Sequence, residues 1–331
     1  MTIPFLLAPM AELSHRALRE LIEDFGGCDE YFTEMISAGA LLSGGPFESY
    51  YIDGEPCPDR VVYQLTGSDP GQIAGAAALL DRKRCAGIDI NMGCSAPAIV
   101  RTGAGVGWMA SVDRAGALIA QVRQRTSKRL SVKLRIGAED NFDYLAAFCR
   151  RLEEEGLDFI TLHPRTAREK FKRRPRWEYA ARLRAVLGIP VAGNGDIASA
   201  GELVRRAAGE GVPRDSPGTA QTWDAVMVGR LAVRCPWVFA QARALEAGGT
   251  NAPASVNLEE TALRFLDLLA RHQPPEFHLS RARRFLGYFC DNLKWAHHVK
   301  TLLNREVSLP ALAARLSAYF RDHPEETRLY L

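Results

Sequence analysis

The sequence has no long apolar run, no large surplus of charge and no paired cysteine motif, and each absence excludes a class of protein. No stretch of about 20 consecutive apolar residues and no basic–apolar–small leader is present, so we expect neither a membrane span nor a secretion signal. The formal net charge of the 331 residues is only +3, so any affinity for nucleic acid must come from local clusters of cations. The seven cysteines are odd in number and have no Cys-x-x-Cys spacing, which supports neither a disulfide framework nor a zinc site. We therefore expect a cytoplasmic protein with free thiols and no metal.

The chain does contain a regular alternation of short β-like runs and amphipathic helical stretches. The β-like runs are residues 3–8, 31–36, 60–65, 87–91, 130–135, 159–162, 189–193 and 225–228. The helix-like stretches between them are residues 14–25, 69–81, 112–125, 143–155, 177–186 and 199–208. Eight such units predict an α/β fold, a (β/α)8 TIM barrel that ends near residue 245. A doubly wound open sheet is the alternative, but no Gly-x-Gly-x-x-Gly motif follows the first run, as that fold usually requires.

Polar and charged residues recur where these apolar runs stop. Chemistry in a TIM barrel is located at the carboxyl ends of the strands, so their joint occurrence predicts one shared site. The residues at these positions are Ala8, Pro9, Met10, Gln64, Asn91, Cys94, Lys133, Arg135, His163, Arg165, Asn194, Gly195, Asp196, Gly229 and Arg230.

The run Ile88-Asp89-Ile90-Asn91-Met92-Gly93-Cys94 is typical of a buried strand that delivers a thiol to the mouth of a barrel. A glycine-rich loop, residues 101–107, follows it, and backbone there can approach a ligand closely. A half-buried cysteine at a turn is the alternative interpretation, because free cysteines are often buried.

Two strand ends indicate an anionic ligand. Lys133 and Arg135 lie on the same face of their strand by its two-residue period, and in a barrel that face points into the lumen. Both could instead extend to water. Asn194-Gly195-Asp196 and Gly229-Arg230 follow the last two strands, where TIM barrels usually bind phosphate. Gln64 could pair with the edge of a heterocycle or bond the neighbouring backbone.

As a set, these motifs resemble those of the tRNA-dihydrouridine synthases in order and spacing. The matching segments are Ala8-Pro9-Met10, Gln64-Leu65-Thr66-Gly67, Asn91-Met92-Gly93-Cys94, Lys133-Leu134-Arg135, His163-Pro164-Arg165-Thr166, Asn194-Gly195-Asp196 and Val228-Gly229-Arg230. The resemblance implies an FMN-dependent barrel that reduces the C5–C6 double bond of particular uridines in tRNA, with NADPH as the reductant.

The resemblance also implies roles for individual residues. Lys133 would lie near the flavin N1–O2 edge, while Asn91, Arg135 and Arg165 would face the substrate. Hydride would go to uracil C6, and Cys94 would give a proton to C5 from the opposite face, because a cysteine thiol ordinarily keeps its proton at neutral pH. The residues implied to bind FMN are Ala8, Pro9, Met10, Gln64, Lys133, His163, Asn194, Gly195, Asp196, Gly229 and Arg230.

Two positions depart from the usual pattern of the family. Ser95 stands where a proline usually follows the cysteine, and Ala98 stands where a lysine is usual. Pro97 is expected to restore the stiffness of the loop, and Arg101 is a candidate replacement for the missing cation.

A basic segment between residues 165 and 184 indicates binding to a phosphate backbone. Phe171 and Trp177 are interleaved with the cations and could stack on an exposed base. A solvated basic loop is the alternative. The cations are Arg168, Lys170, Lys172, Arg173, Arg174, Arg176 and Arg182, of which Arg173, Arg174 and Arg176 are the predicted RNA contacts.

The remaining segments predict two domains, a catalytic barrel over residues 1–247 and a helical RNA-binding bundle over residues 257–331. A linker at 247–256 separates them, the chain after it is expected to be helical, and residues 209–222 form an insertion on the face away from the chemistry. We expect a monomer whose partner is tRNA. The alternative functions are an FMN barrel reductase for free pyrimidines or enones, and an inactive RNA-binding homologue.

Overall fold

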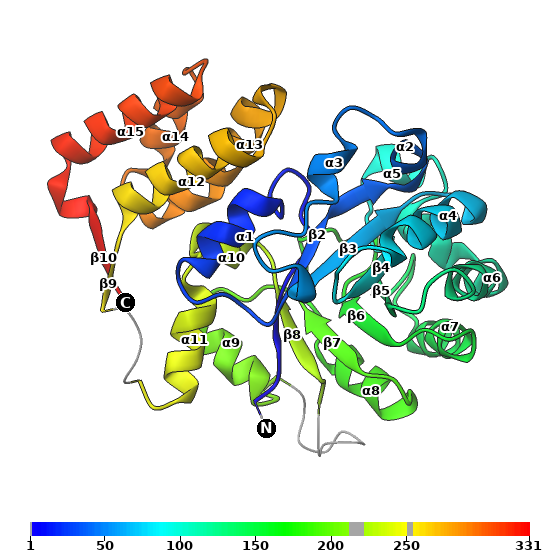
Figure 1. Cartoon of the computed structure of the whole chain (residues 1–331). Helices are drawn as coiled ribbons and strands as arrows, with labels where there is room; N and C mark the ends of the chain where they lie inside the picture. Colours follow the sequence, from blue (N-terminus) through cyan, green and yellow to red (C-terminus); the bar gives the residue numbers. More distant parts are fainter. Residues whose placement is uncertain (1, 212–221, 250–253) are drawn as a thin grey trace.

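Eight parallel strands form a closed barrel in which each strand pairs with the next along the chain and β8 pairs with β1. The computed structural model describes residues 2–211, 222–249 and 254–331 (Figure 1). This arrangement confirms the predicted (β/α)8 TIM barrel. The strands are β1 (Phe5–Leu7), β2 (Glu30–Ser37), β3 (Val61–Thr66), β4 (Gly87–Met92), β5 (Arg129–Arg135), β6 (Phe159–His163), β7 (Val191–Asn194) and β8 (Ala225–Val228).

Side chains of the barrel strands alternate between the helices outside and the lumen inside, because successive residues of a strand point to opposite faces. A small apolar cluster that includes Phe32, Val62 and Phe159 is separate from the main core that the helices cover. Nearer the carboxyl ends of the strands, polar residues take the place of this apolar cluster in the lumen. Gln64 on β3 is paired with Asp89 on β4, and Asp89 is paired with Ser131 on β5. The lumen therefore becomes polar toward the end at which the site was predicted.

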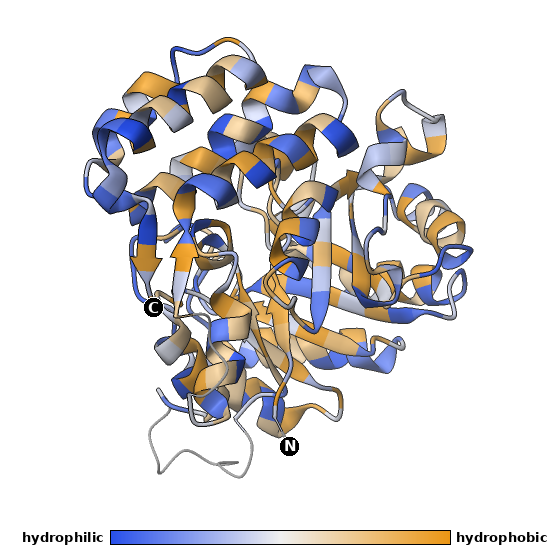
Figure 2. Cartoon of the chain, turned by 60° about the vertical axis from the view of Figure 1, so that its left-hand side comes forward, coloured by the Kyte–Doolittle hydropathy of each residue, from blue (hydrophilic) through white to orange (hydrophobic). Residues whose placement is uncertain are grey.

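Several of the helices around the barrel begin at side-chain caps that the sequence supplies. Asp69 accepts a hydrogen bond from the backbone N–H of Gln72 at 2.8 Å, and Asn141 accepts one from that of Tyr144 at 3.0 Å. Figure 2 shows these helices with mixed hydrophobic and hydrophilic surfaces around mainly hydrophobic strands. The barrel helices are α1 (Arg16–Glu23), α2 (Ala38–Ser43), α3 (Glu48–Tyr51), α4 (Pro70–Asp81), α5 (Pro97–Val100), α6 (Val112–Arg123), α7 (Phe142–Glu154), α8 (Glu178–Val186), α9 (Ala200–Ala207), α10 (Arg230–Arg234) and α11 (Val238–Glu246).

Four further α-helices pack beside the barrel on the side of α1 and α10 (Figure 1). They are α12 (Leu258–His272), α13 (Pro275–Phe289), α14 (Ala296–Leu303) and α15 (Leu309–Asp322). Arg264 on α12 binds Asp24 at 2.8 Å and Glu20 at 3.3 Å across the contact with α1. The division into two domains at residues 247 and 257 stays a prediction.

The expectation that the chain after residue 257 is helical is confirmed by α12 to α15, but it was wrong for the end of the chain. The last residues form β10 (Arg328–Tyr330), which pairs antiparallel with β9 (Ser255–Asn257), so the end of the predicted linker is also a strand. Each strand has only three residues, and their partners lie more than 70 residues apart in the chain, so no local pattern marks them. Most of the predicted insertion at 209–222 lies outside the described residues.

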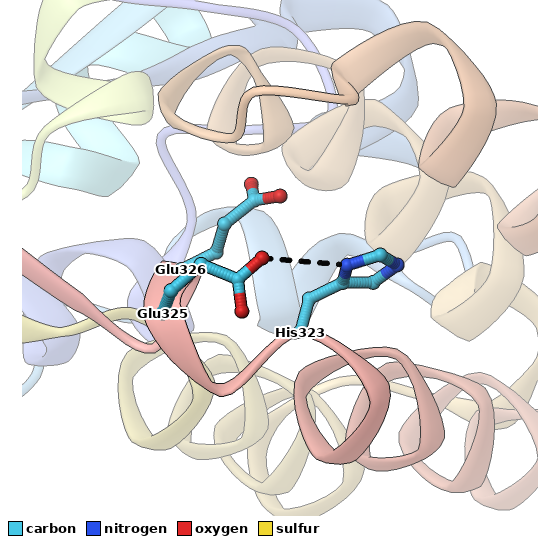
Figure 3. A group of neighbouring side chains, drawn as sticks. All are labelled: His323, Glu325 and Glu326. Carbon is cyan, nitrogen blue, oxygen red and sulfur yellow. Dashed lines mark ion pairs between the residues drawn. The ribbon is translucent and has the colours of Figure 1, made fainter.

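His323, Glu325 and Glu326 gather between α15 and β10 (Figure 3). The two carboxylate oxygens of Glu326 accept hydrogen bonds from the Lys294 backbone N–H at 2.7 Å and the Tyr319 hydroxyl at 2.8 Å. His323 Nδ1 lies 3.6 Å from Glu325 Oε1. These contacts tie the last turn of the chain to the segment before α14.

None of the helices in the described part of the chain is both long and apolar enough to cross a lipid bilayer.

Candidate active site

A cavity of about 610 Å³ opens at the carboxyl ends of the barrel strands. Gln64, Arg165, Arg173, Arg174 and Arg176 do not line it. The predicted site residues that do are Ala8, Pro9, Met10, Asn91, Cys94, Lys133, Arg135, His163, Asn194, Gly195, Asp196, Gly229 and Arg230. The structure thus brings together residues from β1, β4, β5, β6, β7 and β8 and from the loops that follow these strands.

A wider hollow of about 790 Å³ lies on the side of the molecule between α3 and the end of α12. Its charged lining is partly paired, since Arg16 binds Asp53 at 3.3 Å and Arg84 binds Asp59. None of the residues predicted for the site lines this hollow, so the barrel cavity is the candidate active site.

Cys94 lies half-buried at the cavity, and hydrogen bonds hold its backbone on both sides. Its N–H donates to Asn91 Oδ1 at 3.0 Å, and its carbonyl accepts from the Val106 N–H at 3.0 Å. Gly105 has a φ of 59°, and a Cβ there would collide with the Cys94 carbonyl oxygen. The glycine-rich loop is therefore needed for this close approach of two backbone segments. Within the described residues, the Cys94 thiol has no hydrogen-bond partner.

Gln64 is fully buried beneath the cavity, where its amide lies between Asp89 and Asn91. Gln64 Nε2 donates to Asp89 Oδ2 at 2.8 Å, and Gln64 Oε1 accepts from Asn91 Nδ2 at 2.9 Å. The Ser131 hydroxyl donates to the other carboxylate oxygen of Asp89 at 2.6 Å. Asp89 and Ser131 were not predicted, although each stands two residues before a predicted site residue on its strand. Burial raises the pKa of Asp89 to about 6, and the bonds from Ser131 and Gln64 oppose this shift.

Lys133 lines the cavity beside this layer, and its ammonium has no hydrogen-bond or ion-pair partner in the part of the chain described. Burial lowers the pKa of Lys133 to about 8, and the charge of Arg135 adds to this effect, while Asp89 and Cys94 oppose it. A cation without a partner at the wall of a cavity is suited to bind an anion or an electron-rich ring.

His163 is buried at the end of β6 and is neutral at physiological pH. Burial lowers the pKa of its imidazole far below the usual value, and the charges of Lys133, Arg135 and other arginines lower it further. Its Nε2 lies 3.3 Å from Arg165 Nη1, which can only donate. His163 Nε2 therefore accepts this bond, and Nδ1 carries the proton.

Arg165 is directed into the protein, with an exposed fraction of only 1%. It binds the carboxylate of Asp196 through both terminal nitrogens, and its Nε donates to the Arg173 carbonyl at 2.5 Å. Arg230 Nη2 lies 3.0 Å from Asp196 Oδ1 and shares this carboxylate. Arg165 therefore holds the loop after β6 against the loop after β7, although the resemblance implied that it faces the substrate.

Arg135 has a similar organising role at the cavity itself. Its Nε donates to the Gly93 carbonyl at 3.1 Å, and its Nη1 donates to the Lys170 carbonyl at 3.2 Å. One side chain thus connects the loop that carries Cys94 with the basic loop after β6.

The basic loop after β6 contains both paired and unpaired cations. Arg176 binds both carboxylate oxygens of Glu169, at 2.8 and 2.6 Å, and its Nε lies 3.0 Å from Asp140. Arg173 is 76% exposed and lies 4.0 Å from Glu169. Arg174 is exposed, with no ion pair among the described residues. The three predicted RNA contacts are thus not equivalent, because Arg176 stabilises the loop.

The two aromatic residues of this segment have different environments. Phe171 is 58% exposed and lines the cavity, with the guanidinium of Arg230 4.5 Å from the centre of its ring. Trp177 is only 2% exposed and packs against Trp223, with ring centres 4.9 Å apart. The expectation that Trp177 could stack on a base was wrong, because its spacing from the cations gave no information about its depth.

A family model described as dihydrouridine synthase matches residues 6–322. The chain belongs to this family. Similar proteins include a probable tRNA-dihydrouridine synthase of Aquifex aeolicus, 32% identical over 71% of each chain. A tRNA-dihydrouridine(16) synthase of Cupriavidus necator is 31% identical over 74% of this chain and 75% of its own. A tRNA-dihydrouridine synthase B of Xanthomonas campestris is 26% identical over 95% of this chain and 92% of its own.

In this dihydrouridine synthase the C-terminal helices also reach the cavity. Arg284 and Tyr288, one turn apart on α13, are part of its lining. Arg284 is exposed and has no ion pair within the described ranges. No local sequence pattern assigns Arg284 or Tyr288 to the cavity, because this contact depends on how α13 packs on the barrel.

The loop after Cys94 shows what the departures from the usual family pattern do here. Ser95 and Pro97 line the cavity, whereas Ala98 and Arg101 do not. Arg101 is exposed and does not line the cavity, so it does not replace the missing lysine at the cavity wall. Lys133 and Arg135 line the same cavity as Cys94, and both are close enough to it for an electrostatic interaction.

Proposed function

We propose that this dihydrouridine synthase reduces specific uridines of tRNA to 5,6-dihydrouridine, with FMN as its bound cofactor and NADPH as the reductant. The observation that carries the proposal is the position of Cys94, whose half-buried thiol lines the same cavity as the ammonium of Lys133, which has no partner among the described residues. The names of the relatives support the tRNA substrate.

The residues of the cavity fit FMN. Its volume of about 610 Å³ lies within the range of roughly 300–1,000 Å³ that is common for cofactor sites. Lys133 would hold the N1–O2 edge of the isoalloxazine ring, where a cation stabilises the charge of the reduced ring. Gly195 and Gly229 line the cavity without side chains of their own, and the exposed Arg230 beside them offers a charge-assisted bond to a phosphate.

The chemistry requires a hydride at uracil C6 and a proton at C5. When bound, FMN supplies the hydride. Cys94 holds the proton in an S–H bond and gives it to C5, at which the double-bond electrons accumulate as C6 is reduced. The thiolate that remains takes a proton from solvent before the next turnover. Asn91 and Val106 fix the backbone of Cys94 from both sides, which keeps the thiol at the cavity.

The charge at the rim of the cavity supports a polynucleotide substrate. Arg168, Lys172 and Arg174 are exposed on the loop after β6, and none of them has an ion pair among the residues described. Arg284 adds an exposed cation from α13 at the cavity. Cations spread over two elements would contact several phosphates, whereas one free pyrimidine offers no such partner.

The proposal is tested with the purified protein under anaerobic conditions. The flavin is released and identified, reduced in the protein with NADPH or NADH, and its reoxidation is followed after addition of unmodified tRNA or free uridine. We expect FMN, faster reduction by NADPH and reoxidation by tRNA alone, with dihydrouridine in the product. Equally fast reoxidation by free uridine would identify a small-molecule reductase, and a protein without flavin would contradict the cofactor assignment.

A further inference from the structure

A continuous line of hydrogen bonds runs beneath the cavity from Ser131 to the peptide of Cys94. The Ser131 hydroxyl donates to Asp89, Gln64 Nε2 donates to Asp89, and Asn91 Nδ2 donates to Gln64 Oε1. Asn91 Oδ1 then accepts the N–H groups of Gly93 at 3.3 Å and Cys94 at 3.0 Å. Asp89, Gln64 and Ser131 are fully buried, and Asn91 is 7% exposed.

The chemical identity of the two ends sets the direction of every bond in this line. An ionised carboxylate only accepts, so Gln64 must present its NH2 group to Asp89 and its oxygen to Asn91. The peptide N–H groups at the other end only donate, so Asn91 must present its oxygen to them and its NH2 group to Gln64. Only one orientation of each amide satisfies both ends, and a reversed amide would leave buried donors facing each other.

Asp89 is the member of the line that ordinary barrel packing does not explain. Interiors of TIM barrels are usually filled by branched apolar side chains, and a buried carboxylate is unfavourable unless its hydrogen bonds are satisfied. Among the described residues, Asp89 makes no ion pair within 4 Å, and the charges of Lys133 and Arg129 only partly offset the effect of its burial. Its two hydrogen-bond partners, Ser131 and Gln64, tie it to the line that ends at Cys94.

We propose that Asp89 is a positioning residue that acts through Gln64 and Asn91 to hold the peptide of Cys94, and with it the thiol, at the cavity. The inference rests on the proposed function in that Cys94 is the proton donor. Asp89 touches neither substrate nor cofactor, because it is fully buried and does not line the cavity. Without Asp89 the buried NH2 group of Gln64 loses its acceptor and moves, and Asn91 loses the partner that fixes its amide. The carbonyl of Cys94 stays bonded to Val106, so the loop shifts rather than unfolds.

The test compares Asp89→Leu with Asp89→Asn, which differ in whether residue 89 can accept a hydrogen bond. In Asp89→Asn the side-chain oxygen can still face Gln64, because the Ser131 hydroxyl can reverse and accept from the new NH2 group. In Asp89→Leu no acceptor remains. Gln64→Met is a second variant, which cuts the line while it leaves Asp89 bonded to Ser131.

The first measurement is the rate at which iodoacetamide alkylates Cys94 in the flavin-loaded protein, read by peptide mass spectrometry with Cys57 as an internal reference. We expect Asp89→Leu and Gln64→Met to change the ratio of the Cys94 rate to the Cys57 rate at least about threefold, and Asp89→Asn to stay near the parent value. A ratio unchanged in both disruptive variants, or changed equally in Asp89→Asn, would overturn the inference. This measurement needs no tRNA, so it judges the positioning role even if the proposed substrate is wrong.

The second measurement is turnover with tRNA. We expect kcat to fall by about 10- to 100-fold in Asp89→Leu, since small misplacement of a reacting group has effects of this size, while the KM for tRNA and the flavin content stay near the parent values. Asp89→Asn should retain most of kcat. A loss confined to KM or flavin content would show a structural role only and contradict the inference, and so would an unchanged kcat. If Asp89→Leu does not fold, Gln64→Met decides by the same two measurements.

Discussion

Glu34 on β2 and Arg281 on α13 form an ion pair at 2.8 Å that is almost completely buried between the barrel and the C-terminal helices. The other carboxylate oxygen of Glu34 accepts the backbone N–H of Glu12 at 2.5 Å. Burial raises the pKa of Glu34, and Arg281 opposes this shift. Arg284 and Tyr288 follow Arg281 on the same helix and line the cavity, so this ion pair fixes α13 where it completes the site.

We expect Arg281→Met to lower the free energy of unfolding by about 3–5 kcal/mol, because it leaves a buried carboxylate without its partner. The double variant Glu34→Leu with Arg281→Met should recover much of this loss, since neither charge is then buried alone. Urea unfolding of the three proteins measures the difference. Additive losses in the double variant would show that the pair does not act as a unit.

Cys94→Ala should reduce turnover by about 10² to 10⁴-fold with little change in flavin content or tRNA affinity, because it removes the proposed proton donor, whose thiol makes no hydrogen bond in the described structure. Single-turnover oxidation of the reduced flavin by tRNA measures the chemical step alone. Cys57→Ala is the matched control, since Cys57 lies outside the cavity. An unaltered single-turnover rate in Cys94→Ala would remove this residue from the mechanism.

Lys133 predicts a specific pH dependence of FMN affinity. Burial has lowered its pKa to about 8, so the free protein loses this cation as pH rises through that value. We expect FMN affinity to weaken above about pH 8, to lose this dependence in Lys133→Met, and to keep the low-pH value to higher pH in Lys133→Arg. Quenching of flavin fluorescence in titrations from pH 7 to pH 9.5 measures it. Parallel pH profiles for the parent and Lys133→Met would assign the dependence to another group.

The same shift has a consequence for the stability of the flavin-free protein. Between pH values of about 8 and the usual 10.5, the unfolded chain carries the Lys133 proton more often than the folded protein does. The contribution of Lys133 to the free energy of unfolding therefore increases with pH between these two values. Below about pH 8 the folded protein bears the full cost of burying the charged ammonium. Relative to Lys133→Met, the parent protein should gain stability from pH 8 to pH 10.5, which denaturant unfolding at several pH values would reveal. A constant difference between the two proteins contradicts a lowered pKa.

The barrel could be predicted from the sequence because its signals are local. Each strand is a short apolar run, and β8 was predicted with the same bounds that the structure has, Ala225–Val228. Helices such as α7 and α9 begin at capping residues next to amphipathic stretches. The pairing of β9 with β10 joins two three-residue segments far apart in the chain, and only tertiary packing determines it.

Within the site, position along a strand was predictable but depth and partners were not. Lys133 lines the cavity as the two-residue period implies. The same period places Asp89 on the lumen side, yet a single carboxylate within an apolar run gives no sign of its role. Arg165 and Arg176 have the residue type of phosphate contacts, but Asp196 from the loop after β7 binds Arg165, and Glu169, which shares a loop with Arg176, binds Arg176.

The exposed part of the basic loop after β6 gives the last prediction. Lys172→Ala with Arg174→Ala removes two exposed cations without an ion pair in the described structure, so tRNA should bind more weakly and the slope of log Kd against log salt should decrease by about 1 per cation that contacts a phosphate. Arg182→Ala is the matched control, because this exposed arginine stacks on Phe142 at 3.6 Å and lies on α8.

Arg176→Ala should instead destabilise the loop, since it leaves Glu169 without its bidentate partner. Fluorescence anisotropy of labelled tRNA at several salt concentrations, with thermal unfolding of each variant, separates these effects. An unaltered salt slope in the double variant would place the phosphate contacts on α13 and the other C-terminal helices rather than on this loop.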